Sequence, residues 1–191
     1  MMPAIRADLL QRYRFDVEDL RQMVQARIID EDARVELIDG ELVELPMTGG
    51  PHKATVARLD RCFHRACGDR VIVWVQNDLE LDQRTLVVPD LMLLKPRAHE
   101  YRGRDPRPKE VLLLVEVADT SVNRDLEVKV PLYAYFGVPL VWVVDLPDKI
   151  VHSFRDPFRG RYRDARQHRG TDLLPVPPQY SGTLSAANVV V

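Results

Sequence analysis

The segment VLLLVEVA, Val111–Ala118, contains one carboxylate inside an apolar run long enough for a buried strand. Side chains of a strand alternate between its two faces, so Glu116 is expected to face an apolar core. Its neighbours on that face would be Leu112, Leu114 and Ala118. An ionised carboxylate persists in such surroundings only when it is paired, hydrogen-bonded or bound to a metal. The sequence therefore predicts a specific partner for Glu116.

Composition places the chain among globular proteins. The 191 residues, of which 46% are hydrophobic, favour a single domain spanning residues 1–191. Because no long uncharged apolar run and no signal-peptide pattern occurs, we expect a cytoplasmic protein that does not contact membranes. The net charge of −2 gives no general sign of nucleic-acid binding. It does not exclude such binding, since a bound metal cation can meet a phosphate.

The part of the chain before this strand has clear periodic patterns. They predict a helix over residues 15–26, a hairpin over residues 34–45, a second helix from Gly49 to Gly68, and two or three strands over residues 71–95. Asp16 is a suitable N-cap for the first helix. Asp39-Gly40 is typical of a type I′ hairpin turn, which needs positive φ at both central residues.

The part after it alternates between exposed and buried patterns. We expect an exposed loop at 95–109, a helix at 122–136, a buried strand at 139–145 and a more exposed strand pair at 149–155 and 161–166. Thr120 or Ser121 would cap the helix, and Pro131 would kink its interior or move its start by one turn. This order of elements predicts an α/β fold with a mixed β-sheet.

A second acid interrupts an apolar run at Asp90. It follows Pro89, which cannot donate to a sheet ladder, so Asp90 is expected at a bend where strand pairing ends. Asp90 and Glu116 together can converge on Mg²⁺ or Mn²⁺, which prefer oxygen ligands. Singly, an acid after proline is typical of a turn, and a strand glutamate can pair with a basic residue. A metal-independent hydrolase that uses paired carboxylates on sugars is a further possibility for these two acids.

Lys129 lies at the margin of the apolar face of the expected helix, four residues after Asp125. Such a spacing is typical of a surface ion pair, which contributes roughly 0.3–0.5 kcal/mol when exposed. On spacing alone, we favour this surface pair over a functional role for Lys129.

Several motifs follow one another between Arg34 and Asp145. They are ELIDGEL at 36–42, an early histidine in the next helix, Pro89-Asp90, Glu116-Val117, D-x-x-x-K-x-x-x-Y at 125–133, and GVPLVWVVD at 137–145. In this order they resemble the Uma-type restriction endonuclease family, a branch of the PD-(D/E)xK nuclease superfamily. The resemblance implies a restriction-endonuclease-like core, in which helices flank a mixed sheet, with an N-terminal helix and hairpin.

The resemblance also implies roles for individual residues. Asp90 and Glu116 match the acids that bind Mg²⁺ or Mn²⁺. Lys129 matches the lysine that positions or polarises the attacking water, moved to the helix from position 118, which is Ala118 here. Glu36 matches a further metal or water ligand and His52 a substrate contact. For these two, a hairpin surface charge and a polar residue at a helix N-terminus are equally simple interpretations.

The function implied is hydrolysis of DNA phosphodiester bonds by a metal-dependent endonuclease, which in this superfamily is often a homodimer. Basic residues at 102–109 and 161–163 are candidates for holding the phosphate backbone, namely Arg102, Arg104, Arg107, Lys109, Arg161 and Arg163. Acids are interspersed in both segments, which favours a plain solubilising role. The missing lysine at position 118 leaves a second hypothesis, a catalytically decayed member of the fold that binds nucleic acid or assists assembly.

Overall fold

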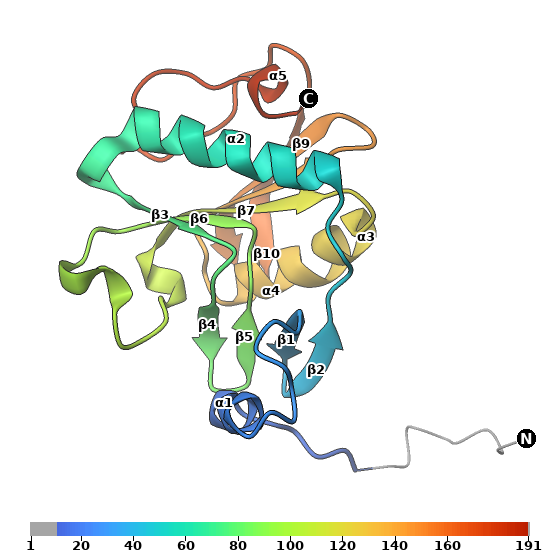
Figure 1. Cartoon of the computed structure of the whole chain (residues 1–191). Helices are drawn as coiled ribbons and strands as arrows, with labels where there is room; N and C mark the ends of the chain where they lie inside the picture. Colours follow the sequence, from blue (N-terminus) through green and yellow to red (C-terminus); the bar gives the residue numbers. More distant parts are fainter. Residues whose placement is uncertain (1–10, 191) are drawn as a thin grey trace, which may run out of the picture.

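Two β-sheets flanked by helices make up the computed structural model, which describes residues 11–190 (Figure 1). The smaller sheet has the order β2-β1-β5-β4, with β1 at Val35–Ile38, β2 at Glu41–Glu44, β4 at Leu79–Asp82 and β5 at Thr85–Val87. The larger has the order β10-β9-β8-β7-β6-β3, with β3 at Ile72–Val75, β6 at Leu91–Leu94, β7 at Val111–Ala118, β8 at Leu140–Asp145, β9 at Ile150–Phe158 and β10 at Arg161–His168. Since β7 and β8 are parallel and their neighbours pair antiparallel, the expected mixed α/β fold is confirmed.

The N-terminal helix and hairpin form as the sequence predicts. Helix α1 (Val17–Gln25) begins with a capping box in which Asp16 and Asp19 each accept from the other's backbone N–H. In the hairpin, Asp39 has a φ of 47° and Gly40 a φ of 76°, as a type I′ turn requires. The turn lies against the chain before α1, because the Phe15 N–H donates to the Gly40 carbonyl at 3.0 Å.

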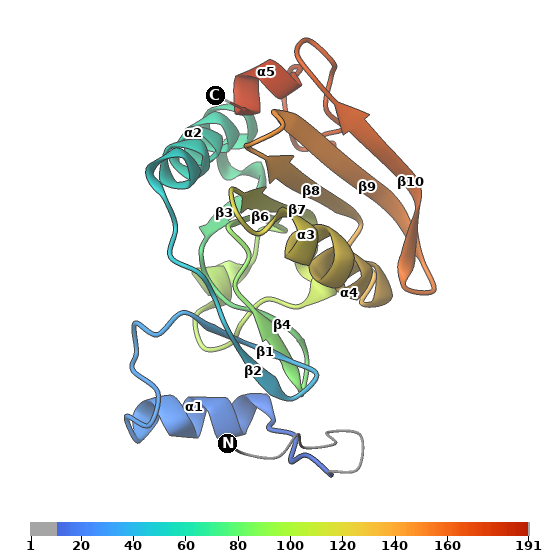
Figure 2. The ribbon, with the colours of Figure 1, turned by 90° about the vertical axis from the view of Figure 1, so that its right-hand side faces the viewer.

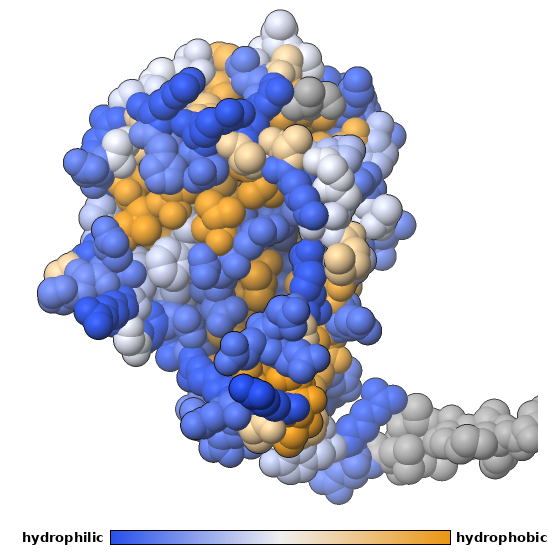
Figure 3. All heavy atoms as spheres, viewed as in Figure 1, coloured by the Kyte–Doolittle hydropathy of each residue, from blue (hydrophilic) through white to orange (hydrophobic). Residues whose placement is uncertain are grey.

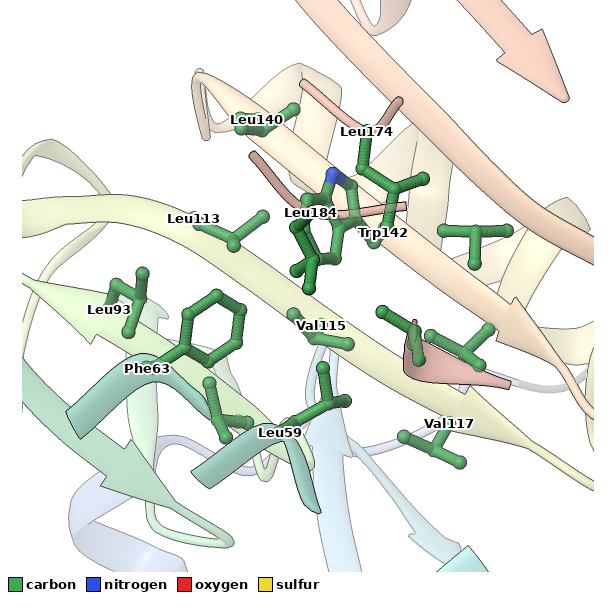
Figure 4. Close-up of a cluster of buried hydrophobic side chains, with 14 of the residues drawn as sticks. Leu59, Phe63, Leu93, Leu113, Val115, Val117, Leu140, Trp142, Leu174 and Leu184 are labelled. Carbon is green, nitrogen blue, oxygen red and sulfur yellow. The ribbon is translucent and has the colours of Figure 1, made fainter. Parts of the chain in front are cut away.

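Helix α2 (Gly50–Cys67) covers one face of the larger sheet (Figure 1). Its Leu59 and Phe63 are fully buried against strand residues such as Val115 and Trp142 (Figure 4). The C-terminal segment, which the sequence did not place, packs into the same cluster through α5 (Ala186–Val189). No helix between residues 11 and 190 is long and apolar enough to cross a membrane.

Strand β7 contains an irregularity that changes which residues share a face. Its register with β6 shifts between Leu93 and Leu94, so Leu112 is the extra residue of a β-bulge. Leu112 therefore packs with the cluster under α2, whereas Leu114 lies in the cluster on the opposite side of the sheet. The expectation that Leu112 shares the face of Glu116 is wrong, because the bulge interrupts the alternation.

Two segments expected to be exposed are partly buried. The loop at 95–109 is anchored by Tyr101, which is buried and donates its hydroxyl hydrogen to the Lys95 carbonyl at 2.8 Å. The first four residues of β9 are buried as well. Most of the loop and most of β10 are exposed, as expected. The expectation fails only locally, at residues such as Tyr101, which packs against Trp74, and at the first four residues of β9.

The helical segment after β7 begins as α3 (Val122–Arg124), continues as a π-helical turn over Asp125–Lys129 and ends as α4 (Val130–Tyr135). The Val130 N–H donates to the carbonyl of Asp125, five residues earlier. Pro131 therefore stands in the first turn of α4, where its missing N–H is tolerated. The expected kink takes the form of this π turn. The expected side-chain cap is absent, since the Ser121 hydroxyl donates to the Asp125 carboxylate at 2.6 Å.

Candidate active site

Segments that are distant in the sequence meet in a pocket of about 230 Å³ at the end of β7. Strand β6 is antiparallel to β7 with Leu91 opposite Val115, so Asp90 lies beside Glu116 at the start of β6. Figures 1 and 2 show the first turn of α2 and the first turn of α3 on either side of this end of β7. Both acids, together with His52 and Lys129, line the pocket.

Lys129 is buried, with 2% of its side chain exposed, and its ammonium lies between two carboxylates. Its Nζ donates to Glu36 Oε1 at 2.7 Å and to Glu116 Oε1 at 3.0 Å. Glu36 is on β1 and Glu116 on β7, so the lysine links the two sheets. The expected surface pair of Lys129 with Asp125 is wrong, because both side chains point inward and Asp125 is itself buried. Glu36, at 1% exposed, is likewise no surface charge.

Asp90 is held by hydrogen bonds from three directions. Its Oδ2 accepts the Val117 N–H at 2.8 Å, in place of a carbonyl of a neighbouring strand. Its Oδ1 lies 2.9 Å from Nε2 of His52 and 3.3 Å from Nε2 of Gln76. An ionised carboxylate only accepts, so the hydrogen of the imidazole is assigned to Nε2 of His52. His52, which is 5% exposed, therefore fixes the orientation of Asp90.

Tyr133 is a site residue that ends the motif D-x-x-x-K-x-x-x-Y and for which no role was predicted from the sequence. Its hydroxyl donates to Glu116 Oε1 at 2.5 Å. Asp125, Lys129 and Tyr133 are spaced by four residues, which puts them on one face of the helical segment. That spacing was visible in the sequence and is the feature from which the role of Tyr133 could have been found. By contrast, the Val88 N–H that donates to Glu36 Oε1 comes from the segment just after β5 and leaves no local pattern.

The buried charges alter one another's protonation. Burial raises the pKa of Glu116 to about 8, although the ammonium of Lys129 opposes the shift. Burial lowers the pKa of Lys129, but Glu116 and Glu36 outweigh it, so that pKa is raised overall. Two carboxyl groups surround one ammonium, and ionising both would bury a net negative charge. We therefore infer that Lys129 is charged and that Glu116 stays protonated until another cation binds beside it.

The oxygen atoms left over in the pocket fit a hard divalent cation. A carboxylate oxygen accepts about two hydrogen bonds. The bonds to Glu116 from Lys129 and Tyr133 both use Oε1, and Oδ2 of Asp90 accepts one bond. Glu116 Oε2 and Asp90 Oδ2 can therefore each ligate a metal. Mg²⁺ is commonly held by one or two carboxylates with waters and substrate phosphate completing its shell.

The protein ligands in this pocket are few. Within residues 11–190, no group of three or more His, Cys, Asp or Glu side chains is arranged to hold a metal ion. Glu36 Oε2 is buried without a hydrogen-bond partner in the same part of the chain, but Glu36 is turned toward Lys129. The pocket therefore matches a cation that takes two carboxylates and keeps several waters, and not a closed three-ligand protein site.

The structure brings together Glu36, His52, Asp90, Glu116 and Lys129, and it leaves the predicted basic residues elsewhere. Arg104 is paired with Glu110, and Arg107 with Glu80 at 2.9 Å. The described residues that line the pocket include none of Arg102, Arg104, Arg107, Lys109, Arg161 and Arg163. The arginines that do line it are Arg34 and Arg124, which no sequence motif indicated.

The fold is similar to that of a solved structure. The match is a crystal structure described as "a putative nuclease belonging to DUF820" from Anabaena variabilis, with a TM-score of 0.69 and 16% sequence identity. The alignment covers 86% of this chain and 94% of that chain. At this identity the similarity shows the fold alone. No curated protein matched the chain at a significant level.

The sequence itself identifies the family. The model of the Uma2 family, described as "Putative restriction endonuclease", matches residues 17–188 and so includes Glu36, His52, Asp90, Glu116 and Lys129. A match over most of the chain shows membership, and the similar fold agrees with it. The chain therefore belongs to the Uma2 family of restriction-endonuclease-like proteins.

Proposed function

We propose that this protein is a divalent-metal-dependent endonuclease that hydrolyses phosphodiester bonds of DNA, with Mg²⁺ or Mn²⁺ as its cofactor. Family membership supports a nuclease and hence a nucleic-acid substrate. The observation that supports the proposal most strongly is the buried ammonium of Lys129 between Glu36 and Glu116, in a pocket shared with Asp90. Buried charges that desolvate and shift one another are typical of catalytic sites.

Each residue has a distinct proposed role. Asp90 and Glu116 would hold the cation, which, when bound, lowers the pKa of a water and neutralises charge on the scissile phosphate. His52 keeps Asp90 oriented through its Nε2–H. An ammonium has three donors, and Lys129 gives two of them to Glu36 and Glu116, so one N–H remains for the attacking water or a phosphate oxygen.

Isosteric substitutions of the two acids test this proposal. Asp90→Asn can still accept from the Val117 N–H, and Glu116→Gln can still accept from Tyr133, so both variants should fold. Each removes a charged ligand, and we expect Mg²⁺-dependent nicking of supercoiled plasmid to fall by roughly 10²-fold or more. Thermal unfolding provides the control for folding. Undiminished nicking by both folded variants would contradict the proposal.

The second candidate is a non-catalytic nucleic-acid-binding or assembly protein with the same fold. It is favoured by the missing lysine at position 118, which is Ala118 here. Titration calorimetry with Mn²⁺ separates the two candidates. Mn²⁺ binding that Asp90→Asn abolishes supports the nuclease, whereas DNA binding without any Mn²⁺ binding supports the non-catalytic protein.

We also propose that the protein acts as a homodimer, which would let two sites address the two strands of a duplex. The support is the resemblance to PD-(D/E)xK nucleases, which often pair in this way. Sedimentation equilibrium measures the state directly. A mass of twice 22.0 kDa is expected, and a single 22.0 kDa species at assay concentrations would contradict it.

A further inference from the structure

Helix α2 concentrates positive charge in a chain that is negative overall. Its four Lys and Arg residues stand against one acid, Asp60, whereas the whole chain has a net charge of −2. Asp60 lies 3.0 Å from Nδ1 of His64. The helix therefore presents a local basic surface that the overall charge does not reveal.

Three of the basic residues, Arg58, Arg61 and Arg65, lie on the side of α2 away from the sheet. The buried side of the helix includes Val56, Leu59 and Phe63, and the arginine positions fall within about 60° of one another roughly opposite to it, at 100° per residue. Figure 3 shows strongly hydrophilic side chains gathered over this helix. The three arginines and Ala54 therefore form one line along the outer face of α2.

These arginines have no partner among residues 11–190, since none of them donates a hydrogen bond or forms an ion pair there. Arg70, just beyond the helix, differs because it donates to Cys67, Ala66 and Ser181. The three arginines instead line an open hollow of about 630 Å³, together with Cys62, Ala66, Tyr180 and Asn188. No acid between residues 11 and 190 lines this hollow, so the positive charge of the arginines is not neutralised within this part of the chain.

The position of this line relative to the pocket indicates the partner. His52, in the first turn of α2, lines the catalytic pocket, and Arg58 stands roughly 9 Å further along the helix axis. Arg58 to Arg65 span about 10 Å more. Each strand of duplex DNA has one negative charge per about 3.4 Å of the helix axis, so a backbone that passes from the pocket over the outer face of α2 would offer about three phosphates over this span.

We propose that Arg58, Arg61 and Arg65 bind the phosphate backbone of the nucleic-acid substrate outside the catalytic pocket. The proposal rests on the proposed nuclease function for the path of the substrate. It replaces the loop arginines with a helix face: Arg104 and Arg107 are held by acids, whereas the α2 arginines are free within the described residues. An arginine fork suits phosphate, and contacts of this kind position a duplex without reading its sequence.

The test is binding of a labelled DNA duplex to the full chain by fluorescence anisotropy, in EDTA and over a range of KCl concentrations. The variant is Arg58→Gln with Arg61→Gln and Arg65→Gln, on an exposed helix face where glutamine is well tolerated. We expect binding to weaken by about tenfold or more, and the slope of log K against log salt to fall by about 2 to 3, since each phosphate contact contributes about 0.9.

The matched control removes the same charge from other surfaces, by Arg27→Gln, Arg84→Gln and Lys149→Gln. These side chains are exposed and line neither the catalytic pocket nor the hollow beside α2. We expect the control to bind DNA within about twofold of the wild type, because no phosphate contact is lost. Equal weakening in both triple variants, or unchanged binding in the α2 variant, would overturn the proposal.

Two further measurements keep the outcomes separate. Competition by polyglutamate as effective as competition by DNA would show a surface for acidic proteins and would overturn a phosphate-backbone site. Plasmid nicking with Mg²⁺ is measured independently of binding. A wild type that never nicks but binds DNA through α2 contradicts the nuclease and leaves the backbone site standing. If the wild type nicks plasmid and the α2 variant binds DNA as well as the wild type does, the nuclease proposal stands and the backbone site is contradicted.

Discussion

At the residue scale, the buried triad of Glu36, Glu116 and Lys129 connects stability with the proposed chemistry. The ammonium is the one basic group that contacts either carboxylate among the described residues. Removing one partner of a buried ion pair leaves an uncompensated buried charge. The resulting loss of folding stability is larger than the net stability that the intact pair contributes. The same arrangement holds Lys129 in place beside Glu116 and Asp90.

Lys129→Met tests this arrangement through stability. The methionine fills a similar volume but leaves the carboxyl groups of Glu36 and Glu116 buried without a cation, so the free energy of unfolding should fall by about 3–5 kcal/mol. Urea denaturation measures it. Adding Glu36→Gln removes the carboxylate that the ammonium had neutralised and should restore at least about 1 kcal/mol. A Lys129→Met variant as stable as the wild type would show that the triad is not a charged network.

The raised pKa of Glu116 predicts how metal binding depends on pH. A carboxyl group must be ionised to ligate a metal, and the pKa of Glu116 is raised to about 8 by burial. Below that pH, binding must release a proton, so affinity for Mn²⁺ should rise with pH toward about 8 and then level off.

Calorimetry in two buffers of different ionisation enthalpy measures the released proton. Near neutral pH, the wild type should release close to one proton on binding Mn²⁺, less whatever fraction of Glu116 is already ionised. Glu116→Gln has no proton to release at this position. Metal affinity that is independent of pH, with no proton released, would contradict the role of Glu116.

The sequence predicted which residues form the site better than it predicted which of them contact one another. Asp90 and Glu116 were visible as acids interrupting apolar runs, and the ordered motifs indicated Lys129, Glu36 and His52. Spacing alone pointed to a surface pair for Lys129, because periodicity shows which residues share a helix face and not what covers that face. Gln76 and the Val88 N–H reach the acids from just beyond the ends of β3 and β5, and only the tertiary fold brings them there.

At the element scale, the β1–β2 hairpin positions Glu36, and its turn is held tightly. Gly40 has a φ of 76°, and a Cβ placed there would lie 2.8 Å from Cβ of Arg14 and 2.9 Å from the carbonyl oxygen of Phe15. Glu36 pairs with Val43 in the register that this turn sets. The turn residue is thus fixed both by its backbone conformation and by the chain that packs against it.

Gly40→Ala should destabilise the protein by about 2–3 kcal/mol or more, combining left-handed strain of about 1–2 kcal/mol with a steric clash. Gly137→Ala is the matched control, because Gly137 has a φ of 77° and open space around the added Cβ. The Gly137→Ala variant should be destabilised only by the left-handed strain, about 1–2 kcal/mol. Chemical denaturation compares the two, and equal losses would show that the packing against Arg14 and Phe15 contributes nothing.

Most elements were predictable because their signals are local. The capping box at Asp16, the Asp39-Gly40 turn and the glycine after α2 each fix the backbone over a few residues. The bulge at Leu112 and the π turn over Asp125–Lys129 were not predictable in this way. Both insert one residue into a regular repeat, and both depend on how a neighbouring strand or a following proline fits.

At the scale of the whole molecule, the candidate site joins the two sheets and the start of α2. Glu36 comes from the smaller sheet, Asp90 and Glu116 from the larger, and His52 from the helix that covers it. A ligand that binds this site only in the folded state must therefore stabilise the entire arrangement. By linkage, the free energy of unfolding rises by about 2.7 kcal/mol at a ligand concentration one hundred times the Kd.

Thermal unfolding with increasing Mn²⁺ measures this linkage. The melting temperature of the wild type should rise with Mn²⁺ concentration, and that of Asp90→Asn should stay constant, because one of the two carboxylate ligands has lost its charge. NaCl at equal ionic strength serves to separate site binding from general salt effects. An equal rise in both proteins would contradict a site at Asp90.

The most direct measurement is a crystal structure of the protein soaked in Mn²⁺, with anomalous scattering used to locate the ion. An anomalous peak bound by Asp90 and Glu116, within reach of the Lys129 ammonium through a water, is the result expected for a metal-dependent nuclease. A well-ordered pocket without a peak at Mn²⁺ concentrations that saturate the protein in solution, or a peak on other residues, would contradict it.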